Sequence, residues 1–136
     1  MQNIEKARTR LVGEVTLVLT DGTEMIESRC RGVRPLLDLF DTGRSFCGFS
    51  AADRVVGRGA AFLYVVLGVS EVYAKVLSEA AAELLSRHGV KYTAEALVPR
   101  IKNRTGDGFC PIESAVVEIT DPHEALEAIR KRLASL

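Results

Sequence analysis

The stretch that decides the fold runs Gly48-Phe49-Ser50-Ala51-Ala52-Asp53-Arg54-Val55-Val56-Gly57-Arg58-Gly59-Ala60-Ala61-Phe62-Leu63-Tyr64. Its pattern predicts a helix, with Ser50 as the N-cap and Asp53 three positions later, as in a capping box. Val56, Ala60, Leu63 and Leu67 would form the apolar face of that helix.

Two glycines, Gly57 and Gly59, stand in the middle of this predicted helix. Glycine inside a helix costs about 1 kcal/mol relative to alanine, so helix stability alone does not favour it. The glycines therefore indicate a close approach, either of a neighbouring strand or of a bound molecule.

Composition predicts an ordinary globular protein. The chain has 136 residues, of which 47% are hydrophobic and 26% charged, which fits a single domain over residues 1–136. Lys plus Arg equals Asp plus Glu at 18 each, so no overall basic field would attract nucleic acid or an anionic membrane. We expect neither partner, although a local basic pocket remains compatible with this balance.

Several features point to a cytoplasmic protein. Residues 1–10 are mostly polar and do not resemble a secretory signal, and the longest apolar run, residues 60–69, is about half the length of a membrane span. The three cysteines, Cys30, Cys47 and Cys110, form no close pair and leave an odd one over. This usage fits a reducing compartment better than a disulfide scaffold.

Outside the opening stretch, strands alternate with helices, which indicates an α/β domain. Residues 14–20 and 23–28 predict a β-hairpin with Asp21-Gly22 as a two-residue type I′ turn. Residues 71–77 and 90–93 predict strands, and residues 94–101 are compatible with a helix. Residues 115–119 fit either a helix or a strand. Further helices are expected at residues 3–10, 34–40 and 79–87, after Cys110-Pro111, and from Asp121 onward.

Three motifs in order resemble an uncharacterised bacterial family, domain of unknown function 1893. They are residues 31–37, residues 50–61, and Asn103-Arg104 followed by Cys110-Pro111-Ile112-Glu113. The resemblance implies a cytidine-deaminase-like fold, a three-layer α/β/α sandwich around a mixed sheet of about five strands, here with an N-terminal β-hairpin. It implies no established activity.

Zinc deaminases carry H-x-E at one helix start and P-C-x-x-C at another. The corresponding starts predicted here read Ser50-Ala51-Ala52-Asp53 and Ser78-Glu79-Ala80-Ala81, which lack the nitrogen and sulfur ligands that zinc prefers. We therefore expect no metal, no cofactor and no zinc-dependent deamination.

Helix starts at Ser50 and Ser78 would lie side by side and offer free amides to an anion. The predicted site for a nucleotide-like or other small anionic ligand comprises Ser50, Ala51, Asp53, Arg54, Arg58, Lys75, Ser78, Asn103 and Arg104. The alternatives are that the arginines are solvated surface charges, that both serines are plain helix caps, and that residues 103–108 form an ordinary turn.

Asp53 and Cys110 are the candidate catalytic residues. A thiol at a helix N-terminus gains nucleophilic character, but neither histidine lies near Cys110 in sequence to act as its base. Two functions follow: a binding module that does not deaminate its ligand, or a metal-independent transferase or hydrolase acting on a nucleotide-like substrate. A purely structural protein that oligomerises through its helices is a third alternative. By analogy with small proteins of this fold, a homo-oligomer is expected.

Overall fold

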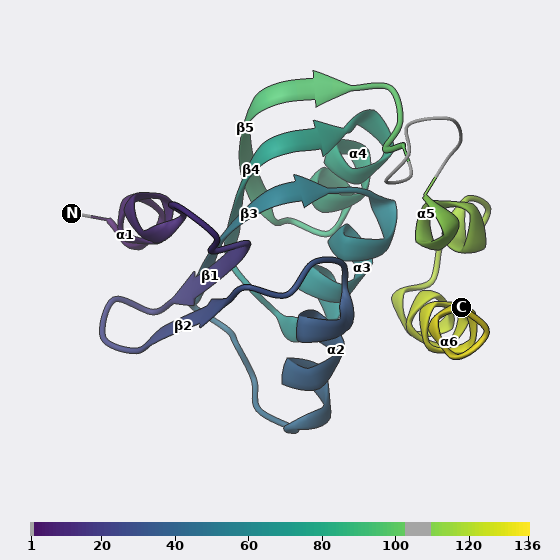
Figure 1. The fold of residues 1–136 in the computed structure, drawn as a ribbon, viewed down its shortest axis with the longest axis horizontal. Coiled ribbons are helices and arrows are strands. Elements are labelled where there is room, and N and C mark those ends of the chain that lie inside the picture. Colours follow the sequence, from purple (N-terminus) through teal and green to yellow (C-terminus); the bar gives the residue numbers. More distant parts are fainter. Residues whose placement is uncertain (1, 103–109) are drawn as a thin grey trace.

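The computed structural model describes residues 2–102 and 110–136. A five-stranded mixed sheet has the strand order β2-β1-β3-β4-β5. β1 is antiparallel to both β2 and β3, whereas β3, β4 and β5 are parallel (Figure 1). The elements are α1 (Asn3–Arg10), β1 (Leu17–Thr20), β2 (Met25–Ser28), α2 (Arg34–Asp41), β3 (Ser50–Val56), α3 (Arg58–Leu67), β4 (Glu71–Ser78), α4 (Glu79–Arg87), β5 (Lys91–Val98), α5 (Pro111–Val116) and α6 (Pro122–Ala134).

The sheet separates two cores. On one face α1 packs over β1, β3 and β4, and a small core forms around Ile4, Ala7, Val18 and Ala52. The other face carries α3 and α4, with α2, α5 and α6 packed around them, and holds the main core, which includes Phe62, Leu63 and Tyr64. The expected mixed sheet with helices on its faces is therefore present (Figure 1).

The predicted helix at residues 50–56 is wrong, because this segment is the strand β3. β3 lies between β1 and β4, so both of its edges are hydrogen-bonded to neighbouring strands. Ala51 and Ala52 are fully buried in opposite cores, where small side chains allow helices to approach both faces. This packing overrides the helical preference of alanine.

The helix itself begins at Arg58, with Gly57 as its N-cap and Gly68 in a left-handed conformation at its C-cap. The two glycines thus stand at the start of α3 rather than in the middle of a longer helix. The glycines do accommodate a close approach, but the approaching element is the helix α5 rather than a strand or a bound molecule: a side chain on Gly57 would meet Glu113, and one on Gly59 would meet Ile112.

Two further predictions are corrected. β5 continues to Val98, so the helix-compatible stretch 94–101 begins as strand. The hairpin turn has four residues rather than two, because Thr20 pairs with Met25. Asp21 stabilises this longer turn, since its Oδ1 accepts hydrogen bonds from the amides of Thr23 and Glu24 at 3.0 and 2.8 Å.

The other expected elements are confirmed. They are α1, α2, β4, α4, α5 after Cys110, and α6 after Asp121. The ambiguous stretch at residues 115–119 continues α5 as far as Val116 and then forms a turn. None of the helices in the described part of the chain has the length and hydrophobicity that crossing a membrane requires.

Candidate functional site

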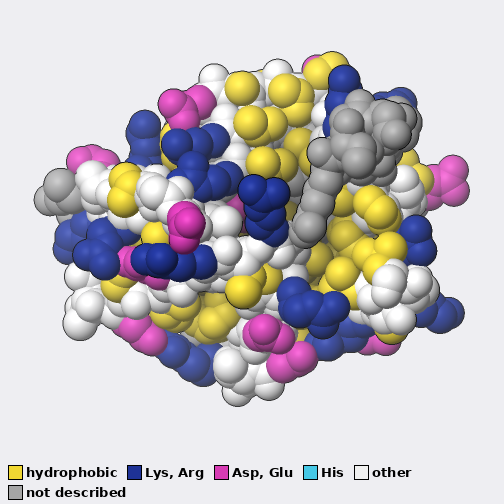
Figure 2. Space-filling view, viewed as in Figure 1, with side chains coloured by type: hydrophobic (Ala, Val, Ile, Leu, Met, Phe, Trp, Pro, Cys, Tyr) yellow, Lys and Arg dark blue, Asp and Glu magenta, His cyan; other side chains and the backbone are white. Residues whose placement is uncertain are grey.

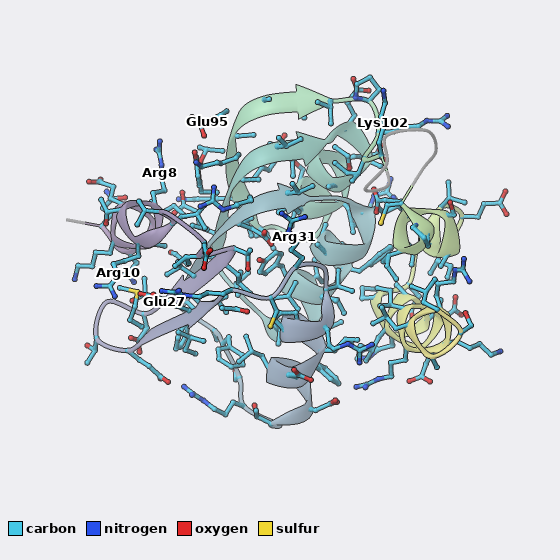
Figure 3. All side chains as sticks on the ribbon, viewed as in Figure 1. Arg8, Arg10, Glu27, Arg31, Glu95 and Lys102 are labelled. Atoms are coloured by element: carbon cyan, nitrogen blue, oxygen red, sulfur yellow. The ribbon has the colours of Figure 1, made fainter. Side chains whose placement is uncertain are left out.

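A groove with a volume of about 450 Å³ lies between α1 and the strands β4 and β5. Helix α1 covers only part of its face of the sheet, which leaves the groove open toward β5. Figure 3 shows Arg8 of α1 and Glu95 of β5 projecting toward this space from opposite sides. The lining residues are Glu5, Arg8, Thr9, Leu11, Tyr73, Lys75 and Glu95.

Lys75 lies two residues after Tyr73 on β4, so the alternation of the strand places it on the face that α1 partly covers. The ladder between β3 and β4 skips Arg54 and Lys75, and the ladder between β4 and β5 skips Lys75 and Glu95. Ala74 and Leu77, three residues apart, both pack into the main core, so the usual alternation of faces is interrupted between them. The register is the same on both sides of the skipped position, so neither strand contains an inserted residue.

Tyr73 organises the floor of the groove. Its hydroxyl donates a hydrogen bond to Glu95 Oε2 at 2.5 Å, and the Arg8 guanidinium lies 4.2 Å from the centre of its ring. Burial, followed by the hydrogen bond to Glu95, raises the pKa of Tyr73 above its ordinary value. The phenol therefore stays protonated and holds the Glu95 carboxylate in place.

Lys75 is a half-buried polar group of the groove without a partner among the described residues. It is half-buried on β4, and it makes no hydrogen bond or ion pair with any residue in the described ranges 2–102 and 110–136. A half-buried ammonium without a partner loses hydration and gains nothing in return. Of the predicted ligand-binding residues that the structure describes, Lys75 is the one that lines this groove.

Arg54 and Arg58 support the backbone instead. Arg54 donates to the carbonyl oxygens of Val15 at 2.7 Å and Gly13 at 2.8 Å, which fixes the segment between α1 and β1. Arg58 donates to the carbonyl oxygens of Val116 at 3.1 Å and Ile119 at 2.5 Å. Neither arginine is the freely solvated charge of the alternative interpretation, because each guanidinium is hydrogen-bonded to two carbonyl oxygens.

The predicted pair of adjacent helix starts at Ser50 and Ser78 is wrong. Ser50 begins β3 and pairs with Glu71 at the start of β4, whereas Ser78 ends β4 and pairs with Val98. The two serines therefore lie at opposite ends of the parallel strands. Ser78 is a helix cap, as the alternative interpretation proposed, since its hydroxyl accepts from the Ala81 amide at 3.1 Å.

The start of α3 is occupied by a carboxylate from the same chain. Glu113 Oε2 accepts a hydrogen bond from the Gly59 amide at 2.9 Å. A negative group at this position complements the partial positive charge of a helix N-terminus. Glu113 thus takes the place at α3 that the sequence had suggested for a bound anion.

Asp53 and Tyr64 form a pair between β3 and α3. Tyr64 is fully buried, and its hydroxyl donates to Asp53 Oδ2 at 2.6 Å. Burial raises the pKa of Asp53 to about 6, although the hydrogen bonds from Tyr64 and from the Val55 amide oppose this shift. The pair faces the main core side of β3, away from the groove beside α1.

Cys110 is the N-cap of α5, and its side chain makes no capping hydrogen bond. It is partly buried and packs against the main core, which fits a packing role. All three cysteines are free, and Cys30 and Cys47 are exposed.

Asn103 and Arg104 lie outside the described residues. Among residues 2–102 and 110–136, no group of three or more His, Cys, Asp or Glu side chains is placed to hold a metal ion.

Sequence reasoning missed most of the groove. Arg8, Tyr73 and Glu95 come from three separate elements, and no local motif connects them. One signal was available: Lys75 and Glu95 each place a charge inside a run of otherwise apolar strand residues. A charge within a strand pattern indicates a position with access to solvent, because charged side chains are rarely fully buried without a partner.

Comparison with known proteins gives the chain its family. The crystal structure of a DUF1893 family protein from Thermotoga maritima is similar to it, with a TM-score of 0.85 and 25% sequence identity over 100% of this chain and 92% of that chain. No curated protein matches the sequence. The family model described as domain of unknown function (DUF1893) matches residues 8–133. The chain therefore belongs to the DUF1893 family.

Proposed function

We propose that this protein binds a small anionic ligand, of nucleotide-like chemistry, in the groove between α1 and β4–β5, and that it does not deaminate this ligand. The observation that carries the proposal is Lys75, whose half-buried ammonium has no partner among the described residues. A phosphate or carboxylate would provide the missing partner, and Arg8 on the opposite wall would contribute a second positive charge.

The surroundings of the groove suit a ligand with both a polar and an apolar part. Val55 pairs with Val76, and Val76 pairs with Ala96, so three apolar residues form a row across β3, β4 and β5. Val55 is 46% exposed. Figure 2 shows hydrophobic side chains over the second half of β4 and β5, beside a cluster of basic side chains. A base or another flat apolar group would find a surface there.

Acidic groups in the groove restrict the ligand further. Glu5 and Glu95 balance the two cations, and Glu95 already accepts the Tyr73 hydroxyl. A bare anion would therefore meet acidic as well as basic neighbours. A ligand that carries hydrogen-bond donors next to its anionic group, as a nucleotide does, satisfies both kinds of side chain.

Thermal-shift titration tests this proposal, with inorganic phosphate, nucleosides and nucleoside mono- and triphosphates as probes. We expect a nucleotide to raise the melting temperature and Lys75→Met to remove the rise. Lys131→Met, which replaces an exposed lysine of α6, serves as the matched control and should leave the rise intact. No shift with any phosphate-bearing probe, or an equal shift in both variants, would refute the assignment.

A second candidate is a metal-independent enzyme acting on a nucleotide-like substrate. The Asp53 carboxyl favours it, because a pKa of about 6 suits a group that exchanges protons near neutral pH. Turnover of a nucleotide that disappears in Asp53→Asn, with the fold retained, would establish this function. Intact nucleotide after prolonged incubation with the wild-type protein would leave the binding function alone.

The finer structural class and the compartment are also proposals. The five-stranded mixed sheet, with α1 on one face and α3 and α4 on the other, supports the deaminase-like sandwich implied by the sequence resemblance. The three free cysteines support a cytoplasmic location.

A further inference from the structure

The strand β5 is an open edge of the sheet. It pairs with β4 on one side, and Figure 1 shows no described element beyond its other side. Seven of its eight residues are exposed, and Tyr92 and Leu97 are 38% and 58% exposed. The opposite edge differs, because β2 has only four residues and its Glu27 forms an ion pair with Arg10 at 2.6 Å. Short edge strands resist pairing with other chains, whereas long open ones invite it.

The backbone of β5 shows which of its groups face the open side. The Lys91 amide donates to the Ser70 carbonyl at the start of β4, so it is directed into the sheet. Amide directions alternate along a strand, which turns the amides of Tyr92 and Ala94 outward. A two-fold antiparallel pairing must match outward-facing residues with one another. Outward-facing residues are two positions apart, so the midpoint between any two of them falls on a residue. The two-fold axis must therefore pass beside a residue, not beside the bond between two residues.

Charge selects one of the remaining registers. With the axis at Thr93, Tyr92 lies opposite Ala94 of a second copy, and Lys91 lies opposite Glu95. The interface then contains two identical Lys91–Glu95 pairs, because the symmetry repeats each contact. With the axis at Ala94, Lys91 would lie opposite Leu97 instead. The strand is therefore electrostatically complementary to itself in one register.

We propose that two copies of this chain pair through β5 in antiparallel orientation about Thr93, forming a continuous ten-stranded sheet in which Lys91 of each copy contacts Glu95 of the other. The two-fold axis is perpendicular to the sheet, so the α1-bearing face of one copy continues into that of the other. Glu95 also lines the groove. The second copy thus closes the open side of the groove and adds a lysine to its wall. This last consequence rests on the proposed ligand-binding function, whereas the pairing itself does not.

Light scattering coupled to gel filtration tests the assembly. We expect a mass of about twice the 14.8 kDa of one chain, with dissociation to monomer on dilution. Lys91→Glu should weaken the dimer at least tenfold, and Lys91→Glu combined with Glu95→Lys should restore it. A monomeric mass over the whole concentration range would overturn the proposal, and so would a dimer that Lys91→Glu leaves unchanged.

Disulfide trapping tests the register. Thr93 would face its own copy in a non-hydrogen-bonded pair, with a Cα separation of about 4.5 Å, which a disulfide can span. In a background with Cys30, Cys47 and Cys110 replaced by serine, Thr93→Cys should cross-link on mild oxidation. Ala96→Cys, on the same exposed strand but three residues from the axis, should not. Equal cross-linking of both variants, or of Ala96→Cys alone, would refute this register. Both experiments omit ligand, so their failure is distinguishable from a failure of the binding proposal.

Discussion

The carboxylate of Glu113, on α5, accepts a hydrogen bond from the backbone amide of Gly59 in the first turn of α3, at 2.9 Å. This contact joins the C-terminal pair α5 and α6 to α3, in the helical layer on the main-core face of the sheet. It also explains both glycines, because an added Cβ at Gly57 would lie 2.4 Å from Glu113 Cδ, and one at Gly59 would lie 2.6 Å from Ile112 Cγ2.

Gly57→Ala should destabilise the protein by displacing Glu113. Gly57 has a φ of −97°, so alanine meets no backbone strain there. The cost comes from moving the carboxylate away from the α3 N-terminus, about 1 kcal/mol in the free energy of unfolding. In a Glu113→Ala background the same substitution should cost less, because no carboxylate is left to displace and only the poorer capping by alanine remains.

Urea unfolding of the four proteins in this double-mutant cycle measures the coupling. The control is Gly89→Ala, at a site where no atom lies within 4 Å of the added Cβ but where a φ of +74° produces strain. Its cost should be the same with and without Glu113. If the cost of Gly57→Ala were likewise independent of Glu113, the carboxylate would not be what the glycine accommodates.

The contrast between α4 and β3 shows how far the sequence predicts this fold. Local sequence patterns correctly predict the Ser78 cap, the helix after it and the strand before it. Ala51 and Ala52 have an equally helical local signal, but they lie in a central strand with a core on each face. Burial on both faces depends on contacts that are distant in sequence, so no local pattern reveals it.

The candidate site shows the same limit. Arg54 and Arg58 are typical anion-binding residues in sequence, yet their guanidinium groups are bound to carbonyl oxygens of distant segments. The groove combines Arg8 of α1 with Lys75 of β4 and Glu95 of β5, which come together only once these elements have packed and paired. Lys75 does line the groove, although the sequence placed it beside two adjacent helix starts that the structure does not contain, and its binding role stays a prediction.

Arg58→Met should weaken the attachment of α5 to α3. The guanidinium donates to the carbonyl oxygens of Val116 and Ile119 where α5 ends, and no aliphatic side chain can replace these hydrogen bonds. Hydrogen bonds to charged groups contribute about 1.5–3 kcal/mol, so we expect a loss of about 2 kcal/mol in the free energy of unfolding. Arg87→Met, at an exposed pair with Glu83 on α4, should cost less than about 1 kcal/mol. Equal losses in the two variants would contradict a structural role for Arg58.

Ser78→Ala should cost more than the corresponding change at the cap of α6. Ser78 is 1% exposed and accepts from the Ala81 amide, so its removal leaves a buried donor without a partner. Asp121 is an exposed cap that accepts from the Glu124 amide, and water can replace it. We expect about 2 kcal/mol for Ser78→Ala and about 1 kcal/mol or less for Asp121→Ala. Chemical denaturation of both variants decides the order, and a larger cost at Asp121 would contradict it.

The free energy of unfolding should fall as the pH rises through the weakly acidic range, because of the ionisation of Asp53. Its pKa is about 6 in the folded protein, against an ordinary value of 3.8, so the folded state binds the proton more tightly than the unfolded state does. The stabilisation is fully present below about pH 4 and is lost as the pH approaches and passes 6. A shift of this size corresponds to roughly 2–3 kcal/mol. Asp53→Asn keeps an acceptor for the Tyr64 hydroxyl but cannot titrate, so subtracting its pH profile from that of the wild type isolates this carboxyl.

Tyr64→Phe provides the matching control for the origin of the shift. The Tyr64 hydroxyl stabilises the Asp53 carboxylate and thereby lowers its pKa, so removing the hydroxyl should move the pH-dependent loss to higher pH. The free energy of unfolding, measured in urea between pH 4 and 8, gives both profiles. Parallel profiles for the wild type and Asp53→Asn would show that Asp53 titrates as an ordinary exposed carboxyl. Such a result would also remove the pKa on which the enzymatic alternative depends, leaving the groove beside Lys75 as the place to look for function.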